Sequence, residues 1–242
     1  MVKQDVVTGR PAVIQKFINL IPKSLRLRFN PRRYAIESFV KKSAKKIKKN
    51  SLILDAGAGP CPYKYMFFHC RYEATDFTDP YKMMDFVCNL DNIPKKDSTY
   101  DVLLSTEVLE HVESPQKVIN EFYRILKSGG KLFLTTPQQY MMHQKPHNYY
   151  YFTYYGLESL LKNTGFRRYK ITPMGGYFWV LADLIKFNSL LEQVKKYKIV
   201  YYPLKVIEFP LTQLIIPFIL FHLDFLDRRR DWTMGYVLEA TK

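Results

Sequence analysis

The sequence contains few cysteines, no stretch typical of a signal peptide and no long hydrophobic run free of polar residues. Its three cysteines, Cys61, Cys70 and Cys88, are odd in number and lack the spacing of metal ligands. Neither a disulfide framework nor a zinc module is therefore expected. Lys16 and Lys23 interrupt the apolar residues near the start, which argues against a signal peptide. We expect a cytoplasmic protein with reduced thiols.

Acidic residues are scarce near the start of the chain. Residues 1–50 hold fourteen lysines and arginines but only Asp5 and Glu37 as acids. Apolar residues at helical spacing predict two basic amphipathic helices here, at 12–21 and 32–49. A charge placed this unevenly favours an anionic partner, either membrane headgroups or a phosphorylated substrate, or it forms a solubilising surface.

From residue 51 onward, strand and helix patterns alternate. The predicted strands are 51–55, 71–76, 86–88, 100–105, 131–136, 166–172 and 234–240, and the predicted helices are 62–69, 115–127 and 154–164. Ser114 and Thr153 stand at helix starts as caps, and Gly129-Gly130 and Gly165 stand at helix ends. This alternation predicts an α/β fold with a mostly parallel sheet covered on both faces.

Residues 174–231 differ in character, being rich in aromatic and aliphatic side chains. Four polar residues interrupt the apolar run between Ile207 and Leu226, namely Glu208, Gln213, His222 and Asp224. A membrane-spanning helix is therefore not expected. Three interpretations stay open: a helical lid over the functional site, a membrane-dipping hairpin, and an additional helical layer.

Ile53–Gly59 carries the most informative pattern, because an apolar strand ends there in Asp55 and is followed by Gly57 and Gly59. Glycine lets the backbone approach a nucleotide-like ligand closely. A carboxylate at this turn would repel a pyrophosphate, whereas it would attract a ligand that carries a sulfonium and an ammonium group. These properties point to S-adenosylmethionine.

Four further segments extend this pattern. Asp76 ends the second predicted strand, 21 residues after Asp55, and Asn89–Pro94 lies before the fourth strand. Tyr100–Val112 ends in Leu-Glu-His-Val, and Glu121–Gly130 reads E-x-x-R-x-L-K-x-G-G. Together these segments resemble the class I S-adenosylmethionine-dependent methyltransferases of the UbiE/UbiG-like (type 11) family.

The resemblance implies a Rossmann-like, doubly wound sheet of seven strands whose last strand is antiparallel. It places the methyltransferase core at 51–173 with 232–242. The residue patterns described above add a basic helical region at 1–50 and a helical insertion at 174–231. The resemblance also implies the residues that bind S-adenosylmethionine: Asp55, Ala56, Gly57, Gly59, Asp76, Phe77, Asn89, Leu90, Ser105, Thr106 and Glu107.

The chain departs from the family pattern at two of its positions. Cys61 stands where another glycine is frequent, and Asn89 stands where an aspartate usually reaches the adenine amino group. An amide oxygen can still accept that hydrogen bond. The resemblance implies no metal.

His111 and His147 are candidate general bases, which methyl transfer needs where the acceptor is a hydroxyl. Each could instead be a structural histidine. Tyr149–Tyr151 could stack on a ring of the acceptor or simply pack.

The resulting hypothesis is O-methylation of a saccharide, a lipid-linked intermediate or a related small metabolite. The segment from His147 to Thr153 resembles a subset of the family associated with cell-surface glycans. An RNA methyltransferase and a catalytically silent cofactor-binding scaffold are the alternatives. Peripheral attachment to the inner face of an anionic membrane is a separate hypothesis, and the oligomeric state is left open.

Overall fold

The computed structural model describes residues 22–187, 191 and 195–242, so the helix predicted at 12–21 lies outside the described residues. The chain divides into two compact units. Ile36–Met174 and Gly235–Lys242 form the sheet unit, and Met1–Ala35 and Gly175–Met234 form the helical unit. Both contain buried apolar side chains, such as Leu103 in the first and Val180 in the second.

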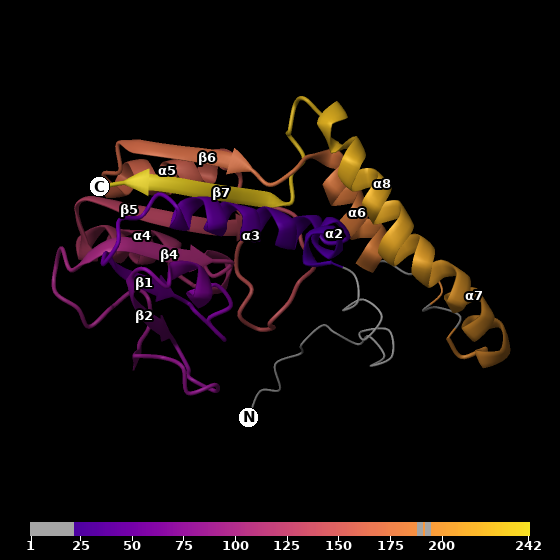
Figure 1. Ribbon diagram of the computed structural model, residues 1–242, viewed down its shortest axis with the longest axis horizontal. Coiled ribbons are helices and arrows are strands. Elements are labelled where there is room, and N and C mark those ends of the chain that lie inside the picture. Colours follow the sequence, from indigo (N-terminus) through magenta and orange to yellow (C-terminus); the bar gives the residue numbers. More distant parts are fainter. Residues whose placement is uncertain (1–21, 188–190, 192–194) are drawn as a thin grey trace. The chain divides into compact units, whose positions relative to one another are not determined.

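The sheet unit contains one seven-stranded sheet in the order β3-β2-β1-β4-β5-β7-β6 (Figure 1). Strands β1 to β5 are parallel, whereas β7 is antiparallel to both neighbours, β5 and β6. The bounds are β1 (Leu52–Ala56), β2 (Arg71–Asp76), β3 (Phe86–Val87), β4 (Tyr100–Thr106), β5 (Leu126–Pro137), β6 (Arg168–Pro173) and β7 (Gly235–Thr241). The predicted Rossmann-like fold is confirmed.

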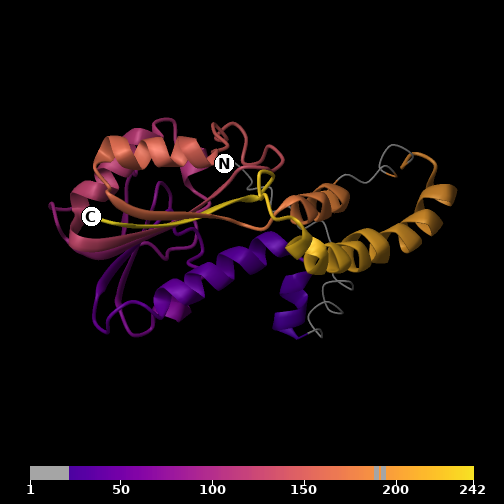
Figure 2. The same ribbon diagram turned by 90° about the horizontal axis from the view of Figure 1, so that it is seen from above.

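Helices cover both faces of this sheet, and their bounds are α3 (Pro31–Ala44), α4 (Pro115–Ile125) and α5 (Tyr154–Thr164). Figure 2 shows α4 and α5 over one face and the later part of α3 over the other. The apolar stripe of α4 is buried, and Phe39 of α3 lies 6.0 Å from Phe133 of β5 between ring centroids. Because the central strands are covered on both faces, β1 and β4 read as nearly continuous apolar runs.

The two ends of α5 form as predicted. The Thr153 hydroxyl accepts a hydrogen bond from the Gly156 N–H at 3.1 Å, which satisfies one of the unpaired donors at the helix start. Gly165, with φ of 107°, ends the helix, and its N–H donates to the carbonyls of Leu161 and Lys162. Glycine suits this place because side chains disfavour a positive φ.

Two local predictions are wrong. The helix expected at 62–69 is only a 3₁₀ turn, η1 (Lys64–Phe67). Cys61 has φ of 50° and lies between two prolines, which leaves few residues for a helix before β2. Gly129-Gly130 does not end α4, which stops at Ile125. The pair lies inside β5, where the pairing with β4 is irregular, and it exchanges backbone hydrogen bonds with Lys242.

Ser114 occupies the N-cap position of α4 without a side-chain hydrogen bond, contrary to its expected role as a cap. Its carbonyl instead accepts from the N–H groups of Lys117 and Val118. Pro115 takes the first helical position as predicted, where its fixed φ suits the helix and no N–H is needed.

The helical unit is built around an aromatic cluster. The rings of Trp179 and Phe221 stack with centroids 5.0 Å apart, and Tyr34 packs edge-on against both. The elements are α2 (Lys23–Arg28), α6 (Tyr177–Phe187), α7 (Lys198–Pro210), the π-helical turn η4 (Leu211–Ile215), α8 (Ile216–Leu223) and the 3₁₀ turn η5 (Asp224–Leu226). The buried Asp224 carboxylate accepts from the Gly176 N–H and pairs with Arg230.

Elements α7 to η5 form a continuous helix, Lys198–Leu226, of 29 residues. An 18-residue window within it has a mean hydropathy of 1.8, and only 11% of that window is buried. By length and composition alone this helix could cross a membrane. The polar residues of this segment led us to expect no membrane-spanning helix. They are too few to lower the mean hydropathy that the surrounding leucines, isoleucines and phenylalanines give the helix.

Candidate functional site

Most of the predicted cofactor residues lie at or just after the carboxyl ends of β1, β2 and β4, whereas Asn89 and Leu90 follow β3. Strands β1, β2 and β4 are adjacent and parallel, and the strand order reverses between β1 and β4. Ligands of open α/β sheets bind at such a reversal. Asp55 lies in register with Ala74 of β2 and Leu104 of β4, and Ala56 is fully buried beside it.

Asp55 is a buried carboxylate with one unsatisfied oxygen. The Tyr72 hydroxyl donates to its Oδ2 atom, whereas Oδ1 has no hydrogen-bond partner among the described residues. Burial raises the pKa of Asp55 to about 7; the Tyr72 hydrogen bond opposes this effect and the Asp76 charge adds to it. A cationic ligand group would stabilise the ionised form of this carboxylate.

Tyr72 is a site residue that sequence reasoning missed. Burial, with the neighbouring Asp55 charge, raises the pKa of Tyr72, so its hydroxyl keeps the proton that it donates. Its position in β2, opposite Ile53 of β1, is the signal that could have found it. Neighbouring parallel strands bring such side chains together.

The glycine turn after β1 brings its backbone close to neighbouring groups. Gly57 has φ of 79°, and a Cβ there would come within 2.4 Å of Val108 Cγ2. The N–H groups of Gly57 and Ala58 donate to the Thr75 carbonyl of β2. Cys61 also has a positive φ, of 50°, which explains why glycine is common at its position. Cysteine adopts this conformation at a cost of about 1 kcal/mol.

Asp76 connects the glycine turn to the end of β2. Its Oδ2 accepts from the Gly59 N–H at 2.9 Å and its Oδ1 from the Phe77 N–H at 2.7 Å. Burial raises the pKa of Asp76 despite these two hydrogen bonds. Each oxygen keeps a second lone pair, as an acceptor for ribose hydroxyls would need. The Phe77 ring is exposed.

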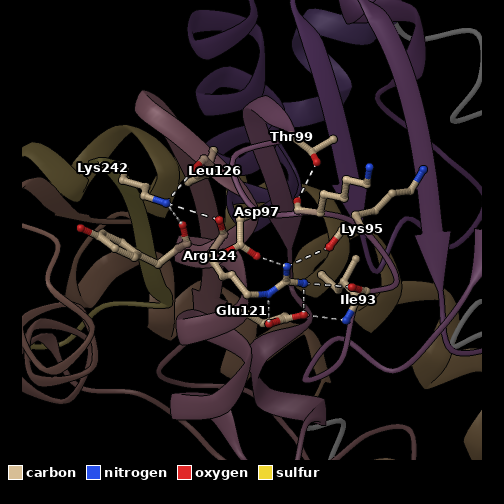
Figure 3. Close-up of polar contacts among 10 residues, drawn as sticks. Ile93, Lys95, Asp97, Thr99, Glu121, Arg124, Leu126 and Lys242 are labelled. Atoms are coloured by element: carbon tan, nitrogen blue, oxygen red, sulfur yellow. Dashed lines mark hydrogen bonds and ion pairs between the residues drawn. The ribbon is translucent and has the colours of Figure 1, made fainter.

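Asn89 and Leu90 lie in the segment that leads from β3 toward β4. The Asn89 side chain is exposed, and Leu90 is buried in the main core. A polar network anchors the residues that follow (Figure 3): Arg124 of α4 donates to the carbonyls of Ile93 and Lys95 at 3.0 and 2.8 Å.

The same guanidinium pairs with two carboxylates, Asp97 and Glu121, at 2.6 Å each (Figure 3). The Ile93 N–H donates to Glu121 at 2.8 Å, and the Arg124 hydrogen bonds lower the pKa of Glu121. In the sequence, the Glu-x-x-Arg pattern was only part of a family resemblance. In the structure, its two side chains hold the loop at Ile93 and Lys95, which lies beside the expected adenine contacts.

Ser105 and Thr106 end β4 and Glu107 follows it, and the three side chains differ in their surroundings. The buried Ser105 hydroxyl donates to the Ala56 carbonyl at 3.0 Å and so joins the ends of β1 and β4. Thr106 is half-buried. Glu107 has φ of 54°, and its Oε1 accepts from the Thr135 hydroxyl at 3.0 Å. Residues other than glycine that have a positive φ are frequent at functional sites.

The structure brings the two candidate bases together through the backbone. His111 Nδ1 lies 2.5 Å from the His147 carbonyl oxygen, and because a carbonyl only accepts, Nδ1 carries the proton. The lone pair therefore lies on Nε2, which is buried and makes no hydrogen bond with the described residues. Burial lowers the pKa of His111, which favours the neutral ring.

The His147 side chain, by contrast, is exposed. Its Nδ1 lies 3.3 Å from the Tyr149 hydroxyl, which donates to Glu113 at 3.0 Å. The His147 ring also lies 6.4 Å from Phe77 between centroids, so this loop reaches the end of β2. The Tyr150 hydroxyl donates to the Glu113 carbonyl.

Glu110, His111 and His143 form a cluster whose donor atoms all lie within 4.8 Å of one another. Two imidazoles and a carboxylate suit zinc or a similar divalent ion. The sequence resemblance implied no metal. The cluster escapes sequence reasoning because His143 comes from the loop after β5, at no recognisable spacing from Glu110.

A family model described as a methyltransferase domain matches residues 28–171. The chain is 36% identical over 101 residues to an uncharacterised protein of Methanocaldococcus jannaschii, covering 36% of this chain and 41% of that protein. An Arabidopsis thaliana tRNA (carboxymethyluridine(34)-5-O)-methyltransferase is 25% identical over 139 residues, which cover 53% of this chain and 34% of that protein. A ubiquinone biosynthesis O-methyltransferase of Pseudomonas savastanoi is 49% identical over 37 residues, which cover 15% of this chain and 16% of that protein. The chain thus matches less than half the length of each.

Solved structures share the fold. A SAM dependent methyltransferase from Archaeoglobus fulgidus superposes with a TM-score of 0.55 at 16% identity, covering 85% of this chain and 94% of that one. A Haemonchus contortus phosphoethanolamine N-methyltransferase, crystallised with S-adenosyl-L-methionine, gives a TM-score of 0.51 at 14% identity. The match covers 97% of this chain and 60% of that one. The chain belongs to the methyltransferase domain family, and the predicted class I methyltransferase is confirmed.

Proposed function

We propose that this chain transfers a methyl group from S-adenosylmethionine to a hydroxyl oxygen, with His111 as the general base. The observation that carries the proposal is the neutral His111 ring, whose Nδ1 proton is held by a carbonyl and whose Nε2 lone pair is free of hydrogen bonds to the described residues. An oxygen acceptor needs such a base, because a hydroxyl is a weak nucleophile.

The residues at the strand ends fit this cofactor. The unsatisfied Oδ1 of Asp55 would accept from the ammonium group of the methionine part, and the positive charge would keep the carboxylate ionised. Asp76 would accept from the ribose hydroxyls, and Asn89 with the Leu90 backbone would contact the adenine. When bound, the cofactor supplies a methyl group on a positively charged sulfur, which is already a good leaving group.

The protein's contribution is to align the acceptor and move one proton. His111 Nε2 would accept the hydroxyl proton of the acceptor as the acceptor oxygen takes up the methyl group that S-adenosylmethionine would supply. The resulting imidazolium lies beside Glu110, whose Oε1 is 3.8 Å away. The acceptor must displace the His143 ring, since its centroid is 4.7 Å from that of His111.

We further propose a saccharide, a lipid-linked intermediate or a related small metabolite as the acceptor. The exposed rings of Phe77, Tyr149 and Tyr150 in the site support this choice, because aromatic faces pack well against sugar and other rings. An RNA acceptor is the second candidate, since one relative is a tRNA methyltransferase and the net charge is +15.

A methyl-transfer assay with labelled S-adenosylmethionine tests the proposal. Candidate acceptors from the saccharide and lipid-linked classes, a small phenol and bulk tRNA are compared, and the methylated atom is identified by mass spectrometry. The expected product is a methyl ether. Methylation confined to tRNA, with activity that falls steeply as salt is raised, would instead support the second candidate, and methylation of nitrogen alone would refute the base.

A further inference from the structure

The long helix of the helical unit carries an exposed apolar stripe along one side. Its members recur at spacings of three, four or seven residues, as one face of a helix requires. They are Leu204, Ile207, Leu211, Ile215, Ile219 and Leu226, whose exposed fractions lie between 41% and 62%. Soluble proteins seldom leave so continuous an apolar surface uncovered.

Two of the polar residues that interrupt the apolar run contact other elements of the helical unit, away from this stripe. The Gln213 side chain donates to the Lys186 carbonyl of α6 at 2.9 Å, and Asp224 is buried against Gly176. Glu208 and His222 stand at the spacing of the stripe. Glu208 is half-buried and pairs with Lys205 at 2.8 Å, and His222 lies 3.4 Å from the Arg28 guanidinium.

The ends of the helix carry basic and aromatic residues. Lys195, Lys196 and Lys198 precede or begin the helix. Arg228–Arg230 follow it, but Asp224, Asp227 and Asp231 balance their charge, and Arg230 pairs with Asp224. Exposed aromatic side chains accompany both groups, with Tyr197 and Tyr202 at one end and Phe225 and Trp232 at the other. Tyrosine and tryptophan favour the bilayer interface, and lysine and arginine bind anionic headgroups.

We propose that the apolar stripe docks in the plane of an anionic lipid bilayer. The helix would lie in the interface with the stripe among the acyl chains and its lysine-rich start against the headgroups, as amphipathic membrane helices do. Anionic headgroups attract this lysine-rich start, whereas a second copy paired in parallel would place two such starts side by side. The proposal is independent of the methyl acceptor.

The packing of the helix favours this in-plane position over a spanning one. One side of α8 packs on α6, and Trp179 of α6 donates from its indole nitrogen to the Phe221 carbonyl at 3.1 Å. To cross the bilayer, the helix would have to leave α6 and expose Gln213 and Asp224 to hydrocarbon, which is costly. Docking through the stripe leaves these contacts intact.

Vesicle flotation of the full chain tests the proposal. The probe is unilamellar vesicles of phosphatidylcholine with about 30% phosphatidylserine, compared with pure phosphatidylcholine, at low salt. The chain should float with the anionic vesicles. Ile215→Glu with Leu211→Glu should reduce binding at least about tenfold, because charge is expelled from the acyl region. Phe68→Glu, a control at an even more exposed apolar side chain in the sheet unit, should bind like the unchanged chain.

Further measurements separate the competing outcomes. Circular dichroism checks that the stripe variant is folded, and light scattering without vesicles reports the oligomeric state. A new tryptophan at the stripe, from Ile215→Trp, should be quenched best by lipids brominated near the headgroup. Absence of flotation, a dimer that the stripe variant dissociates without any lipid binding, or quenching greatest at the bilayer centre would each overturn the proposal.

Discussion

Asp55 is a buried carboxylate of the proposed cofactor site, and its protonation changes the charge there. With a pKa near 7, it is partly protonated at neutral pH and poorly suited to attract a cation when protonated. A ligand that carries an ammonium group binds the ionised form, so ligand binding and proton release are linked. The pH of the solution therefore acts directly on the proposed cofactor affinity.

We expect the affinity for S-adenosylmethionine to rise as the pH increases from 6 to 7.5, by up to about tenfold per pH unit below the pKa. Calorimetric titration in buffers of different ionisation enthalpy measures both the affinity and the released proton. Asp55→Asn should bind weakly at every pH. An affinity that is flat with pH in the unchanged chain would refute this linkage.

The same shift has the opposite effect on the cofactor-free fold. The folded pKa of Asp55 lies above its unfolded value of about 3.8, so the folded state holds the proton more tightly and stability is lost as pH rises between these values. Asp55→Asn should thus stabilise the free protein at pH 8 by about 2–4 kcal/mol, measured by urea denaturation. At pH 4 it should have little effect.

Two glycines of the turn provide a matched comparison. Gly57→Ala places a Cβ against Val108, whereas Gly59→Ala meets no atom within 4 Å, and both have a positive φ. We expect Gly59→Ala to lower the free energy of unfolding by about 1 kcal/mol and Gly57→Ala by clearly more. Adding Val108→Ala should rescue part of the Gly57→Ala loss. Equal losses in the two single variants would contradict the contact.

The role of His111 is separable from that of His147. Because His111 Nε2 holds the lone pair, His111→Ala should lower kcat by about 10²- to 10⁴-fold, while His147→Ala should change it far less. Turnover is also measured after treatment with a chelator. Activity that disappears with the chelator and returns with one divalent ion would show that Glu110, His111 and His143 form a metal site instead.

At the scale of elements, helix α4, which carries the Glu-x-x-Arg pattern, covers the sheet and also holds the loop at Ile93 and Lys95. Arg124→Ala would leave the carbonyls of Ile93 and Lys95 without this donor, so we expect a loss of about 1–3 kcal/mol in stability. Arg124→Lys keeps the charge but lacks the planar fork, and should recover only part of it. Urea denaturation measures the loss, and cofactor titration shows whether adenine binding weakens with it.

Local capping chemistry predicted the ends of α5, although the same reasoning failed for the Ser114 side chain at the start of α4. The Thr153 cap and Gly165 end of α5 lie where the sequence placed them, because both act on their own backbone neighbourhood. Gly129-Gly130 did not mark the end of α4 as predicted, because two adjacent glycines can equally lie in an irregular stretch of a strand, as they do in β5. Tyr72 and His143 were missed because their partners come from other elements, and no local pattern records such contacts.

At the scale of the whole molecule, both tryptophans, Trp179 and Trp232, belong to the helical unit. Tryptophan fluorescence therefore reports on that unit, while far-ultraviolet circular dichroism reports on both. Because each unit has its own core, we expect different urea midpoints for the two signals. S-adenosylmethionine should raise the midpoint of the dichroism signal and leave fluorescence nearly unchanged. Coincident transitions that shift together would show one cooperative unit.

The position of β7 between β5 and β6 affects how the protein is made. During synthesis the ribosome releases β5, then β6, then residues 175–234 of the helical unit, before the seven residues of β7 that join the two strands. Until those residues emerge, one edge of β5 and the whole of β6 lack a strand partner, and unpaired edges are open to wrong pairings. We therefore expect the sheet to be completed only after its last strand has been translated.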